Sequence, residues 1–213
     1  MLLNATVGSC VVAFGDSTTA PRENLVTYAD LLRAELPGFG VNVDVINAGV
    51  RGNTSADGRQ RFAADVLAHD PGLVIIQFGI NDAAVDVWKD PPATSSRVAM
   101  VQFIDNLTLF IEQLRRRSAA PLLMTPNPLH WTPELLALYG KPPYRPDDAD
   151  GFNLILRDYA EAVRVLATRT TTPLIDIFAL FDSLPLPELL LDGIHPNARG
   201  HRLVADQLLA VLV

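Results

Sequence analysis

The stretch GSCVVAFGDSTT, residues 8–19, decides the fold that this sequence predicts. Its first eight residues form a nearly continuous apolar run, which is typical of a strand buried on both faces of a parallel sheet. The polar residues Asp16 and Ser17 follow immediately. We therefore expect a buried first strand that ends at Asp16 and presents the Ser17 hydroxyl at the edge of the sheet.

Four further apolar runs follow along the chain, at residues 41–47, 73–78, 121–125 and 173–177. Amphipathic segments with helical periodicity alternate with these runs, at residues 25–36, 57–68, 99–117, 153–168 and 197–212. This strand–helix alternation predicts a parallel sheet with helices on both faces, because each parallel connection must cross over the sheet. Since no internal repeat or linker interrupts the pattern, we expect one domain over residues 1–213.

The composition excludes several classes of protein. The chain has 213 residues, of which 49% are hydrophobic, a higher fraction than intrinsically disordered chains have. Its net charge of −7 argues against nucleic-acid binding, and its single cysteine excludes a disulfide framework. No apolar run approaches the ~20 residues of a membrane span. Residues 1–7 lack the basic residue typical of a signal peptide, so the default location is the cytoplasm.

Residues suited to acyl transfer follow the predicted strands. The turn after the second strand contains Gly52, whose backbone N–H can approach a ligand closely. The third strand is followed by Asn81, whose side-chain amide can donate to an oxyanion. Asp192 precedes His195 by three residues, which lets a carboxylate orient an imidazole toward a nucleophile. Each feature alone is also typical of an ordinary turn or cap, but together with Ser17 they supply the parts of an acyl-transfer site.

These segments resemble the sequence blocks of the SGNH hydrolases, the GDSL esterase and lipase family. The matching segments are GDS at residues 15–17, NAGVRGNT at 47–54, GIND at 79–82 and DGIHP at 192–196. They span nearly the whole chain, and Thr18 stands where the family's namesake leucine would be. The resemblance implies a flavodoxin-like three-layer α/β/α sandwich with a five-stranded parallel sheet.

The same resemblance implies a role for each candidate residue. Ser17 would be the nucleophile, His195 the general base and acid, and Asp192 the carboxylate that orients His195. The backbone N–H groups of Ser17 and Gly52 and the side chain of Asn81 would form the oxyanion hole. The resemblance implies hydrolysis of a small-molecule or carbohydrate ester, without a metal or an organic cofactor.

Two connections are longer than is usual in compact α/β domains, at residues 82–96 and 126–149. Both follow the carboxyl ends of strands, where open α/β sheets bind ligands. They contain Trp88, His130 and Trp131, which we predict to contact the substrate. Because aromatic rings stack on sugar rings, a carbohydrate O-acetyl ester is the first choice of substrate.

The second connection also supports another choice of substrate. Tyr139 and Tyr144 add aromatic rings that suit a sugar. The neighbouring Leu135, Leu136 and Leu138 could instead line a groove for a longer acyl chain, as in lysophospholipid or thioester hydrolysis. The sequence leaves both substrates open, along with acyl transfer to an alcohol, and gives no prediction of oligomeric state.

The turn after the first strand also allows functional classes other than a hydrolase. A flavodoxin-like binding protein would use residues 17–19 to cradle a phosphate, and a non-hydrolytic relative would bind carbohydrate without turnover. A phosphoacceptor receiver domain is disfavoured, because Asp16 lacks the clustered acidic residues that such a site needs. His201, on the predicted last helix, is expected to be solvated.

Overall fold

Five parallel strands form one sheet in the computed structural model, which describes residues 10–213. The strands are β1 (Cys10–Gly15), β2 (Asp44–Gly49), β3 (Leu73–Gln77), β4 (Ala120–Met124) and β5 (Leu174–Ile175). They lie in the order β2-β1-β3-β4-β5, and all four pairings are parallel. The predicted five-stranded parallel sheet is confirmed, and residues 8 and 9 of the predicted first strand lie outside the described residues.

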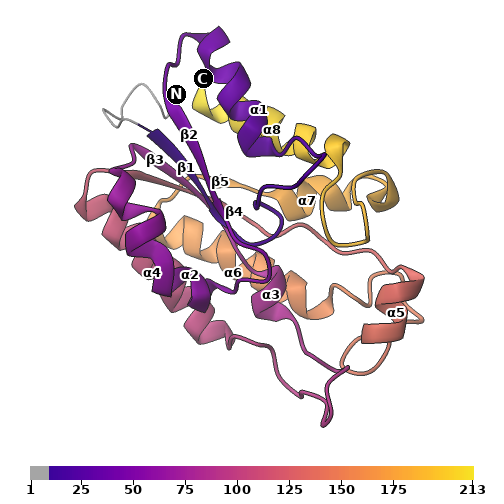
Figure 1. Ribbon diagram of the computed structural model, residues 1–213. Coiled ribbons are helices and arrows are strands. Elements are labelled where there is room, and N and C mark those ends of the chain that lie inside the picture. The colour runs from indigo at the N-terminus through magenta and orange to yellow at the C-terminus, as the bar shows by residue number, and fades with distance from the viewer. Residues whose placement is uncertain (1–9) are drawn as a thin grey trace.

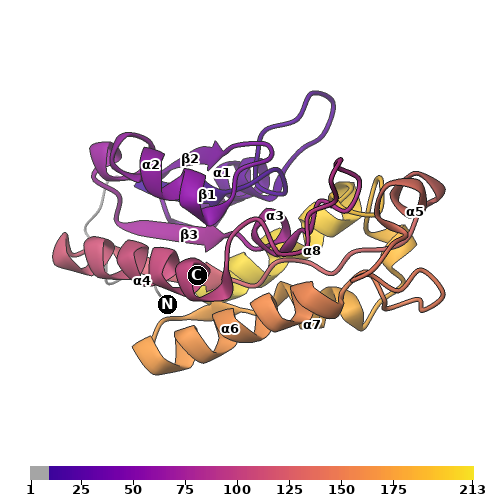
Figure 2. The same ribbon diagram turned by 90° about the horizontal axis from the view of Figure 1, so that it is seen from below.

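Helices cover both faces of the sheet (Figure 1). One layer contains α1 (Tyr28–Glu35), α7 (Ile177–Asp182) and α8 (Ala198–Leu212), and the other contains α2 (Ser55–Asp65), α4 (Met100–Arg116) and α6 (Leu154–Thr170). Two short helices, α3 (Ile80–Ala83) and α5 (Pro133–Tyr139), belong to the connections after β3 and β4. Figure 2 shows both of them on the side toward which the strands point. Within residues 10–213 no helix is long and apolar enough to cross a membrane.

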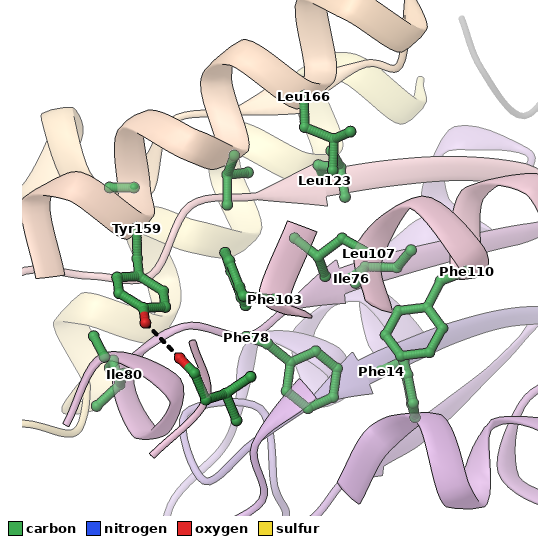
Figure 3. Packing of buried hydrophobic residues seen from close by; sticks show 14 of the residues in the cluster. Phe14, Ile76, Phe78, Ile80, Phe103, Leu107, Phe110, Leu123, Tyr159 and Leu166 are labelled. Atoms are coloured by element: carbon green, nitrogen blue, oxygen red, sulfur yellow. Dashed lines mark hydrogen bonds between the residues drawn. The ribbon is translucent and has the colours of Figure 1, made fainter. Parts of the chain in front are cut away.

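The alternating side chains of β1 pack into two separate cores. Val11 contributes to the core beneath α1 and α8, whereas Val12 and Phe14 contribute to the core beneath α2, α4 and α6. The ring of Phe14 lies 5.1 Å from that of Phe78 and 5.4 Å from that of Phe110, as centroid distances (Figure 3). Because both faces of β1 are covered, an apolar residue is needed at every position, which explains the continuous run in the sequence.

Two helices begin directly after a capping residue rather than at the start that their sequence pattern predicts. Thr27 accepts a hydrogen bond from the Asp30 N–H, and the Asp30 carboxylate accepts one from the Thr27 N–H, so α1 begins at Tyr28. Thr54 and Asp57 form the same capping box, and α2 therefore begins at Ser55 rather than at residue 57.

The prediction of a solvated His201 is wrong. The side chain is buried between α8 and α1, where its Nδ1 accepts a hydrogen bond from the Tyr28 N–H at 3.3 Å. Burial, assisted by the positive charge of Arg22, lowers the pKa of His201 to about 4. The imidazole is therefore neutral at neutral pH and belongs to the packing between the two helices.

Candidate active site

Ser17 lies in a tight turn at the carboxyl end of β1. The N–H groups of Thr19 and Ala20 both donate to the Asp16 carbonyl, at 3.3 and 3.0 Å, so the chain turns as soon as the strand ends. Ser17 is only 9% exposed, and its Oγ lies 2.9 Å from Nε2 of His195. The sequence separation of 178 residues between the two is bridged because the loop before α8 returns to this edge of the sheet.

His195 is held by the carboxylate of Asp192. Its Nδ1 lies 2.7 Å from Asp192 Oδ2, while Asp192 Oδ1 accepts from the N–H groups of His195 and Ile194 at 2.9 and 3.1 Å. Although partial burial opposes ionisation, the hydrogen bonds from the side chain and N–H of His195 hold the pKa of Asp192 well below its usual range. Gly193, with φ +83°, allows the tight turn between the two residues.

Gly49, the last residue of β2, and Gly52, in the turn that follows, are needed for different structural reasons. A Cβ on Gly49 would lie 2.3 Å from the backbone nitrogen of Ala20, so Gly49 permits the Ser17 turn to pack against β2. Gly52 has open space around it but adopts φ +76°, a conformation that favours glycine, and it lines the same cavity as Ser17.

Asn81, in the first turn of α3, is fixed at both ends of its side-chain amide. Its Nδ2 donates to the Asn53 carbonyl at 3.0 Å, and its Oδ1 accepts from Arg97 Nη1 at 3.1 Å. Together these two bonds determine which end of the amide carries the donor. The second hydrogen of Nδ2 is free of the Asn53 bond and can serve a ligand in the cavity.

Arg97 is a site residue that the sequence analysis missed. Its Nε and Nη2 donate to Asp86 Oδ1 at 3.0 and 2.6 Å, and Lys89 Nζ lies 2.7 Å from Asp86 Oδ2. Partial burial opposes ionisation of Asp86, but its bonds to Arg97 and Lys89 hold its pKa below the usual value. No local motif indicates this cluster, because it forms only when the connection after β3 folds back and the Arg97 N–H bonds the Ala84 carbonyl.

Two buried carboxylates lie directly beside the site residues. Asp16 Oδ1 accepts hydrogen bonds from the N–H and Oγ1 of Thr18 at 2.9 and 2.8 Å, and burial raises its pKa. Asp82 Oδ1 accepts from the Ser55 N–H at 2.8 Å, and burial raises its pKa to about 6. These carboxylates anchor the loops that carry Ser17 and Asn81.

A cavity of about 370 Å³ opens beside Ser17 and His195. Part of its lining is apolar and forms an apolar wall, and the rest contains three arginines, Asn81 and two tyrosines. The apolar wall consists of Ile80, Ala83, Ala84, Leu129, Phe152, Ile155, Leu156 and Ile194. The polar lining consists of Arg22, Arg51, Asn81, Arg97, Tyr139 and Tyr144.

Trp88, His130 and Trp131 lie outside this lining. Trp131 stacks on the wall residue Phe152, with ring centroids 4.2 Å apart and 7° between the planes. Trp88 is 47% exposed, and its Nε1 donates to the Tyr139 hydroxyl at 3.3 Å. The backbone N–H of His130 donates to the carbonyl of Gly193 at 2.8 Å. The structure therefore brings the three residues against the wall and the His195 loop, and not to the cavity itself.

The parallel sheet, the serine at its edge and the flanking layers define the class of the protein: an α/β/α ester hydrolase of the SGNH type. The chain belongs to the GDSL-like Lipase/Acylhydrolase family, whose model matches residues 13–203. Membership of that family makes it a carboxylic ester hydrolase by class.

Relatives and solved structures extend this comparison. The acetylxylan esterase of Geobacillus stearothermophilus is 26% identical over 182 residues, covering 82% of this chain and 74% of the relative. The uncharacterized lipoprotein YqeF of Bacillus subtilis is 39% identical over 125 residues, covering 56% of this chain. That match spans about half of the lipoprotein, 49% of its length. The crystal structure of the acetyl xylan esterase AlAXEase superposes with a TM-score of 0.73 at 27% identity, covering 95% of this chain and 99% of the other.

Proposed function

We propose that the protein is a serine ester hydrolase that works through an acyl-enzyme on Ser17. The observation that carries the proposal is the continuous arrangement of Ser17 Oγ, His195 and Asp192, with distances of 2.9 and 2.7 Å between successive partners. A nucleophile, a base within hydrogen-bond reach and a carboxylate that orients the base are the requirements for this chemistry. A phosphate-binding protein would leave Asp192 and His195 without a role.

In the first half of the reaction, Ser17 Oγ attacks the ester carbonyl while its proton passes to His195 Nε2. His195 then donates that proton to the oxygen of the departing alcohol as the carbon–oxygen bond breaks. Asp192 accepts the Nδ1–H of His195 throughout and stabilises the imidazolium, and its lowered pKa keeps it ionised. In the second half, water gives a proton to His195 as its oxygen attacks the acyl carbon. The bond between that carbon and Ser17 Oγ then breaks, and His195 returns the proton to Oγ, which releases the acid and restores Ser17.

The negative charge on the carbonyl oxygen requires fixed donors. We assign them to the backbone N–H groups of Ser17 and Gly52 and to Nδ2 of Asn81. Arg97 and the Asn53 carbonyl support the third assignment, since they hold the Asn81 amide with its nitrogen as the available donor. Losing one such donor lowers kcat on the order of 10²–10³-fold in serine hydrolases.

For the substrate, we propose acetyl esters of carbohydrates or other small alcohols. Acetylxylan esterases are among the relatives, and an isoamyl acetate-hydrolyzing esterase of Saccharomyces cerevisiae is 24% identical over 213 residues. Tyr139 and Tyr144 contribute to the lining of the cavity, and aromatic rings of this kind suit the faces of sugars.

A second candidate is an ester with a longer acyl group. It is favoured by the apolar wall around Phe152 and Leu156, which extends well beyond what an acetyl group would cover. The leucines predicted to line an acyl groove do not contribute to this wall, because Leu135 packs in the core and Leu136 and Leu138 are exposed on α5.

Hydrolysis of p-nitrophenyl esters from acetate to palmitate tests both candidates. Wild-type protein is compared with Ser17→Ala and with Ser183→Ala, which removes an exposed serine after α7. We expect Ser17→Ala to abolish turnover and labelling by a fluorophosphonate, and Ser183→Ala to retain both. An optimum at acetate supports the first substrate and an optimum at longer chains the second. Undiminished turnover in Ser17→Ala would refute the mechanism.

Two further expectations from the sequence stay predictions: that residues 1–213 form one domain, and that the protein acts in the cytoplasm.

A further inference from the structure

Arg22 and Arg51 form a positively charged junction between two hollows of the surface. Both line the cavity that contains Ser17 and His195. Both also line an adjoining groove, whose other walls include Leu25 and Leu191. A molecule that extends from the Ser17 cavity into the groove therefore passes the two guanidinium groups.

Neither guanidinium has a carboxylate partner among residues 10–213, unlike Arg97, which pairs with Asp86. Arg22 Nη2 donates to the Ser17 carbonyl and Arg51 Nη2 to the Pro21 carbonyl, each at the long distance of 3.5 Å. The two carbonyls are neutral acceptors, so neither guanidinium is paired with a carboxylate by these bonds. Partial burial lowers the pKa of Arg22; the negative charge of Asp192 opposes this change, and the positive charge of Arg51 adds to it.

The acidic groups near this pair form no ion pair with it among the described residues, although the charge of Asp192 acts on Arg22. The carboxylate of Asp192 already makes two hydrogen bonds with His195, and it accepts a third from the Ile194 N–H. Glu23 lines the groove but is exposed to solvent and forms no ion pair with either arginine. The chain as a whole has a net charge of −7, yet two guanidinium groups without an ion-pair partner lie beside the candidate nucleophile.

The role of His195 indicates which part of the ester, the alcohol or the acyl group, lies at this junction. His195 must reach the oxygen of the departing alcohol, so the alcohol leaves on the His195 side of the ester. Leu191 in the wall of the groove directly precedes Asp192, so the groove adjoins the loop that carries His195, and we place the alcohol there. The apolar wall of the cavity, on α3 and around Phe152, remains for the acyl group.

We propose that Arg22 and Arg51 form a subsite for an anionic group, a carboxylate or a phosphate, on the alcohol part of the ester. The inference rests on the proposed serine hydrolase and deepens it by naming the substrate class: acetylated or acylated alcohols that carry a negative charge, such as sugar acids or phosphate-bearing alcohols. Planar guanidinium groups suit such ligands because they donate two parallel hydrogen bonds to a carboxylate or phosphate.

Matched acetate esters test the subsite. The probes are para-acetoxybenzoate, para-acetoxyphenyl phosphate and neutral para-acetoxybenzamide, each rate being normalised to hydroxide-catalysed hydrolysis of the same ester. The ratio of kcat/KM for an anionic ester to that for the amide is measured in wild type, Arg22→Gln, Arg51→Gln and the double variant. Arg116→Gln, at the exposed end of α4, is the control for the loss of one positive charge.

We expect wild type to prefer an anionic ester by about tenfold, a preference that weakens with added salt. The ratio should approach one in the double variant and stay at the wild-type value in Arg116→Gln. Preference for the carboxylate over the phosphate, or the reverse, separates the two sources of negative charge. A ratio near one in wild type, or an unchanged ratio in the double variant, would overturn the subsite.

The neutral ester keeps this test separate from the proposed function. If para-acetoxybenzamide is hydrolysed and the activity is lost in Ser17→Ala, the hydrolase stands whatever the ratio shows. If that activity persists in Ser17→Ala, the proposed function fails first, and the subsite fails with it. Arg22→Lys and Arg51→Lys, which retain charge, should keep part of the preference and so separate recognition from a folding defect.

Discussion

The buried carboxyl group of Asp82 makes a strong prediction about stability. Burial raises its pKa from the ordinary value of 3.8 to about 6, although hydrogen bonds from Ser55 oppose the change. Since one pKa unit corresponds to about 1.4 kcal/mol, ionisation of Asp82 costs the folded state about 3 kcal/mol relative to the unfolded chain. Below about pH 3 the group is protonated in both states and this cost is absent. The cost grows as the pH rises from about 3.8 to about 6, where the unfolded chain is ionised and the folded state is not, and it is complete above about 6.

The substitution Asp82→Asn isolates this contribution. The asparagine carbonyl can accept the Ser55 N–H as the carboxylate Oδ1 does, at 2.8 Å, but the side chain never ionises. The difference in unfolding free energy, variant minus wild type, should therefore rise by about 3 kcal/mol between about pH 3 and pH 8, with its midpoint near pH 5, halfway between the unfolded and folded pKa values. Taking the difference cancels the contributions of carboxylates common to both proteins.

Urea denaturation, followed by intrinsic fluorescence across this pH range, measures the difference. Asp105→Asn, on the exposed face of α4, removes one negative charge and controls for the altered net charge. The comparison is valid only if the slope of the unfolding free energy against urea concentration is the same in all three proteins. A pH-independent difference, or one that falls as the pH rises, would refute the argument that Asp82 is destabilised by burial in its ionised form.

Two further predictions concern the oxyanion side of the site and the core. Arg97→Met should lower kcat by about 10–100-fold with little change in KM, because the Asn81 amide loses one of its two hydrogen-bond partners. Steady-state kinetics measure this loss. Arg97→Lys, which retains a positive charge for Asp86, should recover part of it. An equal fall in kcat for Lys89→Gln, which touches Asp86 but not Asn81, would contradict the positioning role. Phe110→Ala should destabilise the protein by about 3–5 kcal/mol, since the ring is fully buried; urea denaturation measures the loss, and a value below about 1 kcal/mol would contradict the packing seen here.

The sequence predicts the sheet well because its strands are buried on both sides. Each apolar run corresponds to a strand, and the parallel order brings the chain segments after β1, β2 and β3 to one edge. Ser17, Gly52 and Asn81 could thus be assigned to the same edge before any contact was known. The pairing of Asp192 with His195 is equally local, because their three-residue separation allows both side-chain and backbone bonds.

What the sequence did not predict depends on contacts between distant segments. Trp131 is interpreted as a substrate residue from its position in a long connection, but the stacking surface that it finds is Phe152, supplied by a later turn. His201 is buried only because α8 packs on α1 and brings it to the Tyr28 N–H. Arg97 carries no signal at all until the connection after β3 folds back toward Asn81. In each case the partner, and not the residue, determines the role.

The buried carboxylates show how stability and function are connected in this site. Asp16 and Asp82 adjoin Ser17 and Asn81, and burial raises the pKa of both, so each ionised group opposes folding at neutral pH. Both nevertheless fix backbone N–H groups of the turns on which the site depends, those of Thr18 and Ser55. A neutral amide could accept the same bonds at lower cost. If Asp82→Asn stabilises the fold at pH 8 but lowers kcat, the negative charge of Asp82 serves catalysis; if kcat is unchanged, its role is confined to anchoring the turn.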